Sequence, residues 1–546
     1  MKMKMKNNFN SLKIAILVFA TLFVSNAYSQ QKTKPNILFI GIDDLKPILG
    51  CYGNSQIKTP NIDRLAKMGT VFMSNYCQQA VCGPTRASLM TGKRPDYTKV
   101  WDLKTKMRDI NPDIVSLPQH LISQGYSTQG IGKIYDSRCV DKKMDAPSWS
   151  VPYYNYFKTE ERYYAKETGM PVLGAYQSQA TKELAIKYTN EGKEKGLADK
   201  ELDDFVSKYV KPSLECADVP DNAYNDGANA SRALEILEKL KSDPKPFFFA
   251  VGFSKPHLPF VSPKKYWDLY KREDMIVASF QEKAKNSVDV AFHNSGEMRG
   301  YSDIPALVSF TDQKDFGLTL PIEKQKELIH GYFAAVSYTD AQVGKLLDKL
   351  DELGLTQNTI IVLWGDHGWH LGDHNLWCKH SNFEQATRTP MIISVPGNTP
   401  SVTSAPSEFV DIFPTLCDAA GVKIPETLDG KSLLPIINKS AKSVKDFSIS
   451  QYPRSGNGSE TERQGYASSK VMGYSLRDNR YRYTIWLTND FRSNKPFSAD
   501  LVVETELYDY EKDPNESVNV ADTKEYKSVA KDLKSKMIKF LATQVK

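Results

Sequence analysis

The chain has 546 residues, of which 40% are hydrophobic and 25% are charged. This composition is ordinary for a folded globular protein and argues against a disordered or low-complexity chain. The formal net charge is +6, but four of these charges are N-terminal lysines, and the remaining charge of about +2 gives no sign of nucleic acid binding.

The N-terminus has the parts of a secretory signal peptide. An apolar run over residues 14–24 precedes Ala27-Tyr-Ser29, which offers small residues where a signal peptidase reads, and it follows the lysines Lys2, Lys4, Lys6 and Lys13. We therefore predict a signal peptide over residues 1–29 and export to the periplasm or beyond. The run is too short for a stable membrane anchor, and no cysteine follows the cleavage point to carry a lipid.

Seven cysteines remain after this segment, at positions 51, 77, 82, 139, 216, 378 and 417. Export would permit disulfides, but the spacings match no zinc-binding pattern, and a chain of this length needs no disulfide framework. Because the number is odd, at least one cysteine is left over, and Cys82 is the candidate.

Short apolar runs alternate with helical patterns along the next four hundred residues. The runs lie at residues 36–40, 247–251, 359–364 and 391–395, and helical spacing appears at 230–240 and 323–353. Uninterrupted apolar runs are typical of strands buried on both faces. The pattern predicts an α/β fold with a large, mostly parallel central sheet.

From about residue 440 the strands become shorter, alternating and rich in aromatic residues, at 474–477, 481–486 and 504–510. A helix is predicted over residues 523–543. We expect a small C-terminal α+β subdomain with an antiparallel sheet (441–546) after a catalytic region (30–440). Residues 141–222 are expected to form insertions and surface helices.

Reactive side chains follow the predicted strands. Asp43 and Asp44 follow the first strand, Asp366 and His367 follow the strand that ends at Trp364, and Lys133 and His257 follow two others. Ligands of open α/β sheets bind outside the carboxyl ends of the strands, so these residues are expected to meet in one crevice. Three carboxylates there would suit Ca²⁺ or Mg²⁺, although such pairs also cap helices or end strands.

Cys82-Gly-Pro-Thr-Arg86 is the most specific motif, and it continues with Leu89, Thr91-Gly92 and Pro95. A buried cysteine, or one bonded to Cys77, is the plain alternative. The extended motif resembles that of the formylglycine-dependent sulfatases. The similarity continues at residues 252–260, 366–374, 377–383, 451–454, 472–477 and 481–486 and is closest to the iduronate 2-sulfatase branch, including bacterial polysaccharide sulfatases such as ulvan-active ones.

The resemblance implies an alkaline-phosphatase-like fold and a defined chemistry. Cys82 would be oxidised to formylglycine by a formylglycine-generating or anaerobic sulfatase-maturating enzyme. One hydroxyl of its hydrate would attack sulfur, and loss of the proton from the other would expel sulfate. One Ca²⁺ per chain would be held by Asp43, Asp44, Asp366 and His367 together with residue 82. Arg86, Lys133 and Lys379 would add positive charge, and His257 would protonate the leaving alcohol.

One residue departs from the family pattern. Asp136 stands where the family commonly has a histidine that helps the hydrate lose its proton. A carboxylate with an ordinary pKa of about 4 is a weak base near neutrality. We hypothesise that Asp136 either takes the base role or binds substrate. His370, His374 and His380 are treated as possible sugar contacts only.

The leading interpretation is an exported sulfatase that acts on a sulfated polysaccharide or its oligosaccharides. The candidates are algal polymers, such as ulvan or carrageenan, and a glycosaminoglycan with a 2-sulfated uronate. The alternatives are a formylglycine-dependent phosphodiesterase or phosphonate hydrolase of the same superfamily, and a non-catalytic carbohydrate-binding relative.

Overall fold

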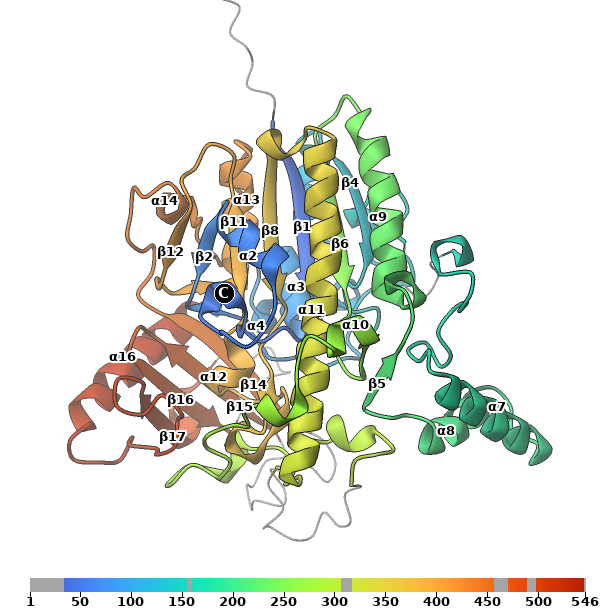
Figure 1. The fold of residues 1–546 in the computed structure, drawn as a ribbon. Coiled ribbons are helices and arrows are strands. Elements are labelled where there is room, and N and C mark those ends of the chain that lie inside the picture. The colour runs from blue at the N-terminus through green and yellow to red at the C-terminus, as the bar shows by residue number, and fades with distance from the viewer. Residues whose placement is uncertain (1–33, 155–159, 306–316, 456–469, 489–496, 545–546) are drawn as a thin grey trace, which may run out of the picture. The chain divides into compact units, whose positions relative to one another are not determined.

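The computed structural model describes residues 34–154, 160–305, 317–455, 470–488 and 497–544 (Figure 1). The predicted signal peptide lies outside the described residues. Within these ranges, no helix combines the length and the apolar character needed to cross a membrane.

A seven-stranded sheet runs in the order β12-β2-β11-β8-β1-β6-β4. Its strands are β1 (Asn36–Ile42), β2 (Thr70–Phe72), β4 (Ser127–Gly132), β6 (Phe247–Phe253), β8 (Thr359–Gly365), β11 (Met391–Ser394) and β12 (Ser401–Thr403). All neighbours pair in parallel except β11, which is antiparallel to both β8 and β2. The predicted mostly parallel α/β sheet is confirmed.

The run at residue 391 forms a strand, but its direction is reversed. Parallel neighbours need a long crossover connection, usually a helix. Between β8 and β11, a stretch that the structure describes in full, the only α-helix is α12 (Glu384–Thr387), which is a single turn. Without a long crossover helix, the chain turns back beside β8 and pairs with it in the opposite direction.

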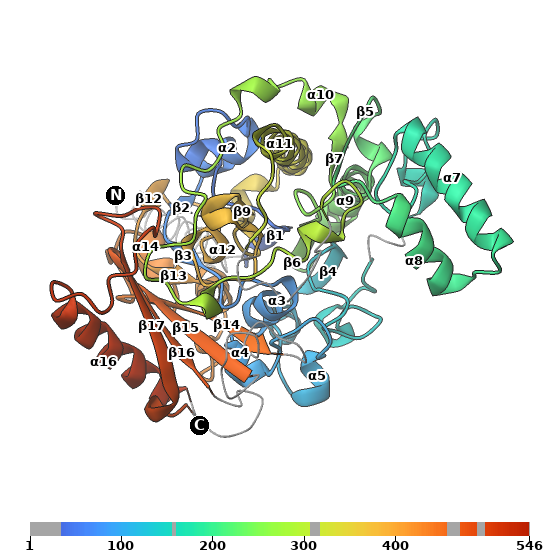
Figure 2. The ribbon, with the colours of Figure 1, turned by 90° about the horizontal axis from the view of Figure 1, so that it is seen from below.

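Helices cover both faces of the sheet, and β1 shows why its sequence is apolar throughout. Leu38, Ile40 and Ile42 pack toward α2 (Pro60–Ala66), α9 (Asn225–Lys241) and α11 (Ile322–Glu352). Ile37 and Phe39 pack toward α3 (Cys82–Thr91), α6 (Leu117–Ser123) and α13 (Ile412–Ala419). Figure 2 shows α11 and α3 on opposite sides of β1. A strand covered twice has no polar face, which confirms the interpretation of the uninterrupted apolar runs.

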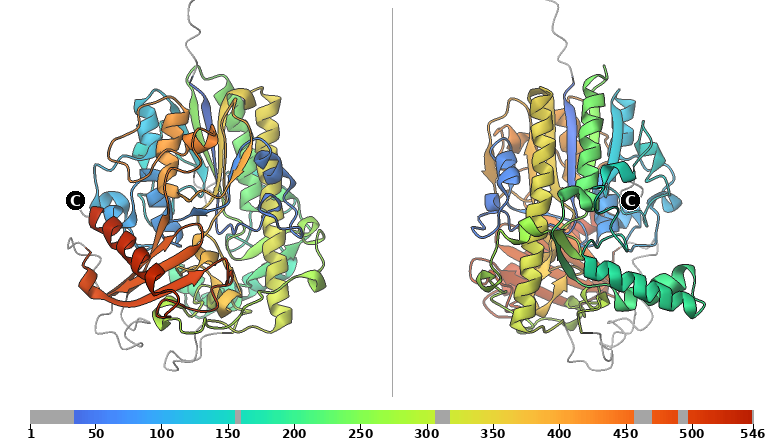
Figure 3. Two further views of the ribbon diagram at one scale, coloured as in Figure 1. Left: turned by 90° about the vertical axis from the view of Figure 1, so that its left-hand side faces the viewer. Right: turned by 45° about the vertical axis from the view of Figure 1, so that its right-hand side comes forward.

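The C-terminal sheet is antiparallel, in the order β14-β15-β16-β17, as predicted. Its strands are β14 (Ser448–Ser455), β15 (Lys470–Arg477), β16 (Tyr481–Leu487) and β17 (Val502–Asp509), and α16 (Lys527–Thr543) packs on it (Figure 3). The prediction missed β14, an edge strand that contains Pro453, a residue that sheets tolerate at such edges but not in central strands. The residues from Asn36 onward group into one compact unit, and a division near residue 440 stays a prediction.

The remaining elements are short or peripheral. The expected surface helices are α7 (Gln179–Glu194) and α8 (Asp199–Tyr209). The others are β3 (Asn75–Tyr76), β5 (Leu214–Ala217), β7 (Phe260–Pro263), β9 (His370–Leu371), β10 (Trp377–Cys378), β13 (Ser407–Glu408), α4 (Pro95–Thr98), α5 (Met107–Ile110), α10 (Lys264–Trp267) and α14 (Leu434–Ile437).

Two glycines let the ends of β4 and β6 approach closely. Gly132 has φ +76°, and a Cβ there would lie 2.0 Å from the carbonyl oxygen of Gly252. A Cβ on Gly252 would lie 2.3 Å from the carbonyl carbon of Lys133. The backbone amide of Lys133 donates to the Gly252 carbonyl at 3.1 Å. The absence of side chains at this crossing therefore lets Lys133 leave the edge of the sheet at this point.

Gly132→Ala is expected to lower the free energy of unfolding more than Gly125→Ala does, by about 1–3 kcal/mol, because the new methyl group has no room. Gly125 is a matched control: its φ is +91°, but nothing lies within 4 Å of the point that an added Cβ would occupy. Urea denaturation of both variants measures the difference. Equal losses would show that the backbone conformation alone, and not the close crossing, demands glycine.

Candidate active site

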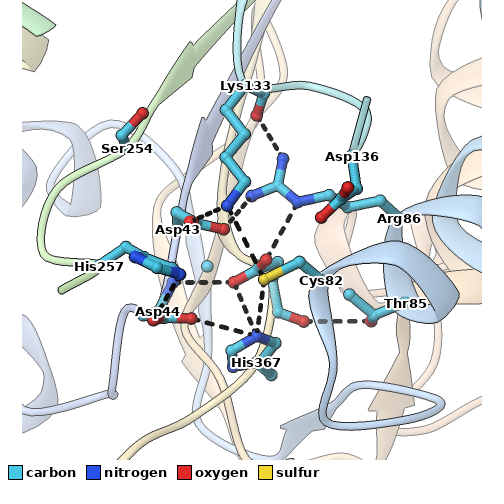
Figure 4. Close-up of polar contacts among 12 residues, drawn as sticks. Asp43, Asp44, Cys82, Thr85, Arg86, Lys133, Asp136, Ser254, His257 and His367 are labelled. Atoms are coloured by element: carbon cyan, nitrogen blue, oxygen red, sulfur yellow. Dashed lines mark hydrogen bonds and ion pairs between the residues drawn. The ribbon is translucent and has the colours of Figure 1, made fainter. Parts of the chain in front are cut away.

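The predicted site residues meet at the carboxyl edge of the central sheet (Figure 4). Asp43 and Asp44 follow β1, Asp366 and His367 follow β8, and Lys133 follows β4. The loop after β6 brings His257, and Cys82 is the first residue of α3. In Figure 4 the side chains of Asp43, Asp44, Cys82 and His367 point toward one another.

The three carboxylates are fully buried, and each has a cationic partner. Arg86 donates to Asp43 at 2.8 Å and to Asp366 at 3.0 Å. Lys133 pairs with Asp43, and Lys379 contacts both oxygens of Asp44 at 3.0 and 3.1 Å. Without these partners, burying three like charges together would be prohibitive.

The same contacts set the protonation of the cluster. Burial would raise the pKa of Asp43, but the charges of Lys133 and Arg86 hold it well below its usual range. Burial and the neighbouring charge of Asp43 raise the pKa of Asp366, despite Arg86 and His367. The three cations thus offset the repulsion between the carboxylates without removing it at Asp366, where an added cation would lower it further.

His367 presents one ring nitrogen to the cluster. A carbonyl can only accept, so Nδ1 donates to the Gly368 carbonyl at 2.9 Å and carries the hydrogen. Nε2 lies 3.2 Å from an oxygen of Asp44 and 3.4 Å from Cys82 Sγ. An Nδ1–H held by a backbone carbonyl is the usual arrangement of a metal-ligating histidine.

The donor atoms fit a divalent cation. Asp44, Cys82, Asp366 and His367 each offer a ligand atom, and these atoms all lie within 4.8 Å of one another. Asp43, Asp44, Cys82 and His257 form an overlapping set. Three carboxylates suit a hard ion of the calcium or magnesium type.

Cys82 occupies the centre of the arrangement. Its side chain is buried, and Sγ lies 3.9 Å from the Lys133 ammonium. Burial and the charge of Asp43 raise the pKa of the thiol well above its usual value. All seven cysteines are free, so Cys77 does not pair with Cys82.

Arg86 lies one turn after Cys82 on α3 but is entirely enclosed. Nε and Nη2 bond the two aspartates, and Nη1 donates to the Ile134 carbonyl at 2.9 Å and to the Lys133 carbonyl. Its face also lies over the Trp364 ring. Arg86 therefore holds the carboxylates and the Lys133 backbone in place and has no free edge for a ligand.

A cavity of about 650 Å³ opens over this centre. Cys82, Lys133, His257 and Lys379 all line it, together with Asp136 and His380. His370 and His374 do not. His370 is buried against Ser381, and His374 is stacked on Phe383, so neither is placed to contact a sugar.

Glu297 is a site residue that the sequence did not reveal. It accepts from Lys379 at 2.9 Å and lies 3.3 Å from Nε2 of His257, whose Nδ1 donates to the Leu258 carbonyl. Burial would raise the pKa of Glu297, but Lys379 and His257 lower it well below its usual range. Glu297 lies in an irregular stretch before α11, without the flanking strand that marked the other residues.

Asp136 lies in the cavity wall, and its carboxylate is held by Arg138. Nε and Nη2 of Arg138 donate to its two oxygens at 2.9 and 2.7 Å. Burial would raise the pKa of Asp136, but these hydrogen bonds and the charge of Lys133 lower it to about 2. Figure 4 draws no interaction between Asp136 and the other residues shown.

The sulfatase family model matches residues 35–422, which is more than half of the chain. The chain belongs to the sulfatase family. The model for the N-sulphoglucosamine sulphohydrolase C-terminal region matches residues 372–543. Iduronate 2-sulfatase of Homo sapiens is 32% identical over 540 residues, which cover 89% of this chain and 90% of that protein. The predicted relationship to sulfatases is confirmed.

Solved structures share the fold of this sulfatase. The phosphonate monoester hydrolase SpPMH from Silicibacter pomeroyi superposes with a TM-score of 0.66 at 21% identity, covering 93% of this chain and 96% of that chain. A protein solved in complex with its substrate, D-glucosamine-2-N,6-O-disulfate, gives a TM-score of 0.64 at 21% identity, covering 94% and 98%. These likenesses confirm the predicted alkaline-phosphatase-like fold.

Adding Ca²⁺ to metal-free protein is expected to stabilise this sulfatase, by about 2.7 kcal/mol at a concentration one hundred times the dissociation constant. The gain should disappear in Asp44→Asn, which removes a carboxylate of the cluster. Asp373→Asn is the control, because Asp373 pairs with Lys46 and belongs to neither ligand set. Urea denaturation with EDTA or Ca²⁺ measures the effect. An equal gain in Asp44→Asn would place the ion elsewhere.

Proposed function

We propose that this sulfatase hydrolyses sulfate esters on a sulfated polysaccharide or its oligosaccharides, with a formylglycine made from Cys82 as the nucleophile. The position of Cys82 carries the proposal: its side chain lies between His367 and Lys133 in the cavity wall. The formylglycine supplies a hydrate with one hydroxyl to attack sulfur and a second whose deprotonation expels sulfate. A formylglycine-generating or anaerobic maturating enzyme would make it.

The cation of this proposal is one Ca²⁺. Asp43, Asp44, Asp366 and His367 would hold it together with residue 82, and it would supply positive charge for the sulfate oxygens. Lys133 and Lys379 line the cavity and can reach the same oxygens. Arg86 would act indirectly, because its guanidinium is fully buried and donates to four protein oxygens.

His257 is proposed as the acid for the leaving alcohol. It lines the cavity, with Nδ1 fixed by the Leu258 carbonyl, so only Nε2 can serve a substrate. Glu297, 3.3 Å from Nε2, orients that nitrogen and balances the charge of a protonated ring. Of the two roles considered for Asp136, we favour substrate binding over proton transfer. A carboxylate with a pKa of about 2 is a poor base near neutrality.

The substrate class is supported by two relatives and by the predicted export. One relative is named an iduronate 2-sulfatase, and one structural neighbour holds a disulfated glucosamine. A glycosaminoglycan with a 2-sulfated uronate and algal polymers such as ulvan or carrageenan are the proposed substrates. Cleavage of residues 1–29 would deliver the enzyme to the periplasm or outside the cell, where such polymers occur.

A phosphonate or phosphodiester hydrolase is the second candidate, and the fold likeness to SpPMH favours it. Sulfate and phosphate esters share shape and charge, so the cluster alone suits either. A carbohydrate-binding relative without activity is less well supported, since the acidic cluster and its cationic partners are all present.

The matured enzyme with Ca²⁺ is expected to release sulfate from one class within a panel of glycosaminoglycan and algal oligosaccharides. Cys82→Ala should release none, because it has no aldehyde to hydrate. Ion chromatography of sulfate measures this, and peptide mass confirms formylglycine. A formylglycine-bearing enzyme that releases no sulfate, but cleaves a bis-aryl phosphate, would replace this proposal with the second candidate.

His257→Gln is expected to lower kcat on a sugar sulfate by roughly 10²- to 10⁴-fold, the usual contribution of an acid catalyst. Its effect on 4-nitrophenyl sulfate should be much smaller, because nitrophenolate departs without a proton. His380→Gln, which changes a second cavity histidine, is the control and should show no such dependence on the leaving group. Equal losses of His257→Gln on both substrates would remove the acid role.

A further inference from the structure

The cavity wall carries more positive charge than one sulfate ester needs. Its cations are Lys133, Arg138, Lys211 and Lys379, against the carboxylates Asp136 and Glu297. Lys133 and Lys379 belong to the acidic cluster around Cys82. Arg138 and Lys211 make no ion pair with that cluster in the described part of the chain, so they do not balance the buried aspartates.

Arg138 is rigidly oriented although half of its side chain is exposed. Asp136, which is only 3% exposed, accepts from Nε, Nη2 and the backbone amide of Arg138 at 2.9, 2.7 and 3.0 Å. A guanidinium has five N–H donors, and this fork uses two of them. The Nη1 edge therefore remains available at the cavity wall, pre-oriented for an anionic group that offers two oxygens.

Lys211 contributes a second cation to the lining of the same cavity. Its ammonium lies 4.8 Å from the centre of the Tyr301 ring, and no carboxylate among the described residues pairs with it. Its backbone is fixed to Ser302 by two hydrogen bonds, at 3.2 and 2.8 Å. A half-buried ammonium with no counter-ion in a cavity wall is suited to an anion brought by the ligand.

We propose that Arg138 and Lys211 form a second anion subsite, which binds a further acidic group of the sugar whose scissile sulfate lies at Cys82. The group is a carboxylate or a second sulfate, since both offer the oxygens that a guanidinium and an ammonium recognise. This inference rests on the proposed function and narrows its substrate to saccharides with at least two anionic groups. Asp136 is then a positioning residue, which acts by holding Arg138.

A binding cycle on the catalytically inert Cys82→Ala protein with Ca²⁺ tests the subsite. Calorimetry compares two matched pairs of disaccharides: a 2-sulfated uronate with its carboxyl methyl ester, and a disulfated with a monosulfated form. Removing the second anion should weaken binding roughly 10- to 100-fold, as expected for a charge-assisted contact. In proteins that also carry Arg138→Ala or Lys211→Ala, removing the second anion from the disaccharide should weaken binding only about twofold or less.

Arg162→Ala is the matched control, because Arg162 is similarly exposed and paired with Glu160 outside the cavity. Lys211→Ala keeps the test valid if Arg138→Ala does not fold, which thermal melts reveal. If the variants reduce the loss of affinity only in the uronate pair, the subsite binds a carboxylate. If they reduce it only in the disulfated pair, the subsite binds a sulfate.

The subsite is refuted if removing the second anion weakens binding by the same factor in the Arg138→Ala and Lys211→Ala variants as in the protein that keeps both side chains. It is also refuted if no disaccharide binds. Because Cys82→Ala performs no turnover, these outcomes are independent of sulfate release by the matured enzyme. A failure of the subsite can thus be told from a failure of the proposed hydrolysis.

Discussion

Three carboxylates buried side by side at one edge of the sheet are the constraint on which this site depends. Two unit charges 4 Å apart repel by about 4 kcal/mol even at an effective dielectric constant of 20. Arg86, Lys133 and Lys379 balance the three negative charges of Asp43, Asp44 and Asp366. A divalent ion added to this balanced set leaves the site positive, which is the sign that an anionic ester requires.

The compensating cations come from separate elements, and a different local feature of the backbone places each of Arg86 and Lys133 at the cluster. Cys82 and Arg86 are four residues apart on α3, so both project from the same face of the helix. Arg86 can thus hold Asp43 and Asp366 while Cys82 meets His367. The spacing of the motif follows from this geometry. Lys133 arrives through the glycine crossing of β4 and β6, where side chains would collide.

Acidic residues outside the cluster shape the cavity by orienting its basic groups. Glu297 holds Lys379 and faces His257, and Asp136 holds Arg138. In both cases a carboxylate fixes a long side chain that would otherwise lose conformational entropy when it binds a ligand. The aspartate at position 136, which departs from the family pattern, has in this way a structural explanation that needs no proton transfer.

The sequence by itself determined the parallel core and the acidic cluster. Uninterrupted apolar runs mark strands covered on both faces, and the residues directly after such strands must meet at one edge of the sheet, as Asp44 and Asp366 do. The motif around Cys82 identified the family. Only the tertiary structure decided the direction of β11, the enclosure of Arg86, and the contacts of Glu297 and Arg138. These depend on which side chains approach one another across irregular loops, and no hydrophobic period records such contacts.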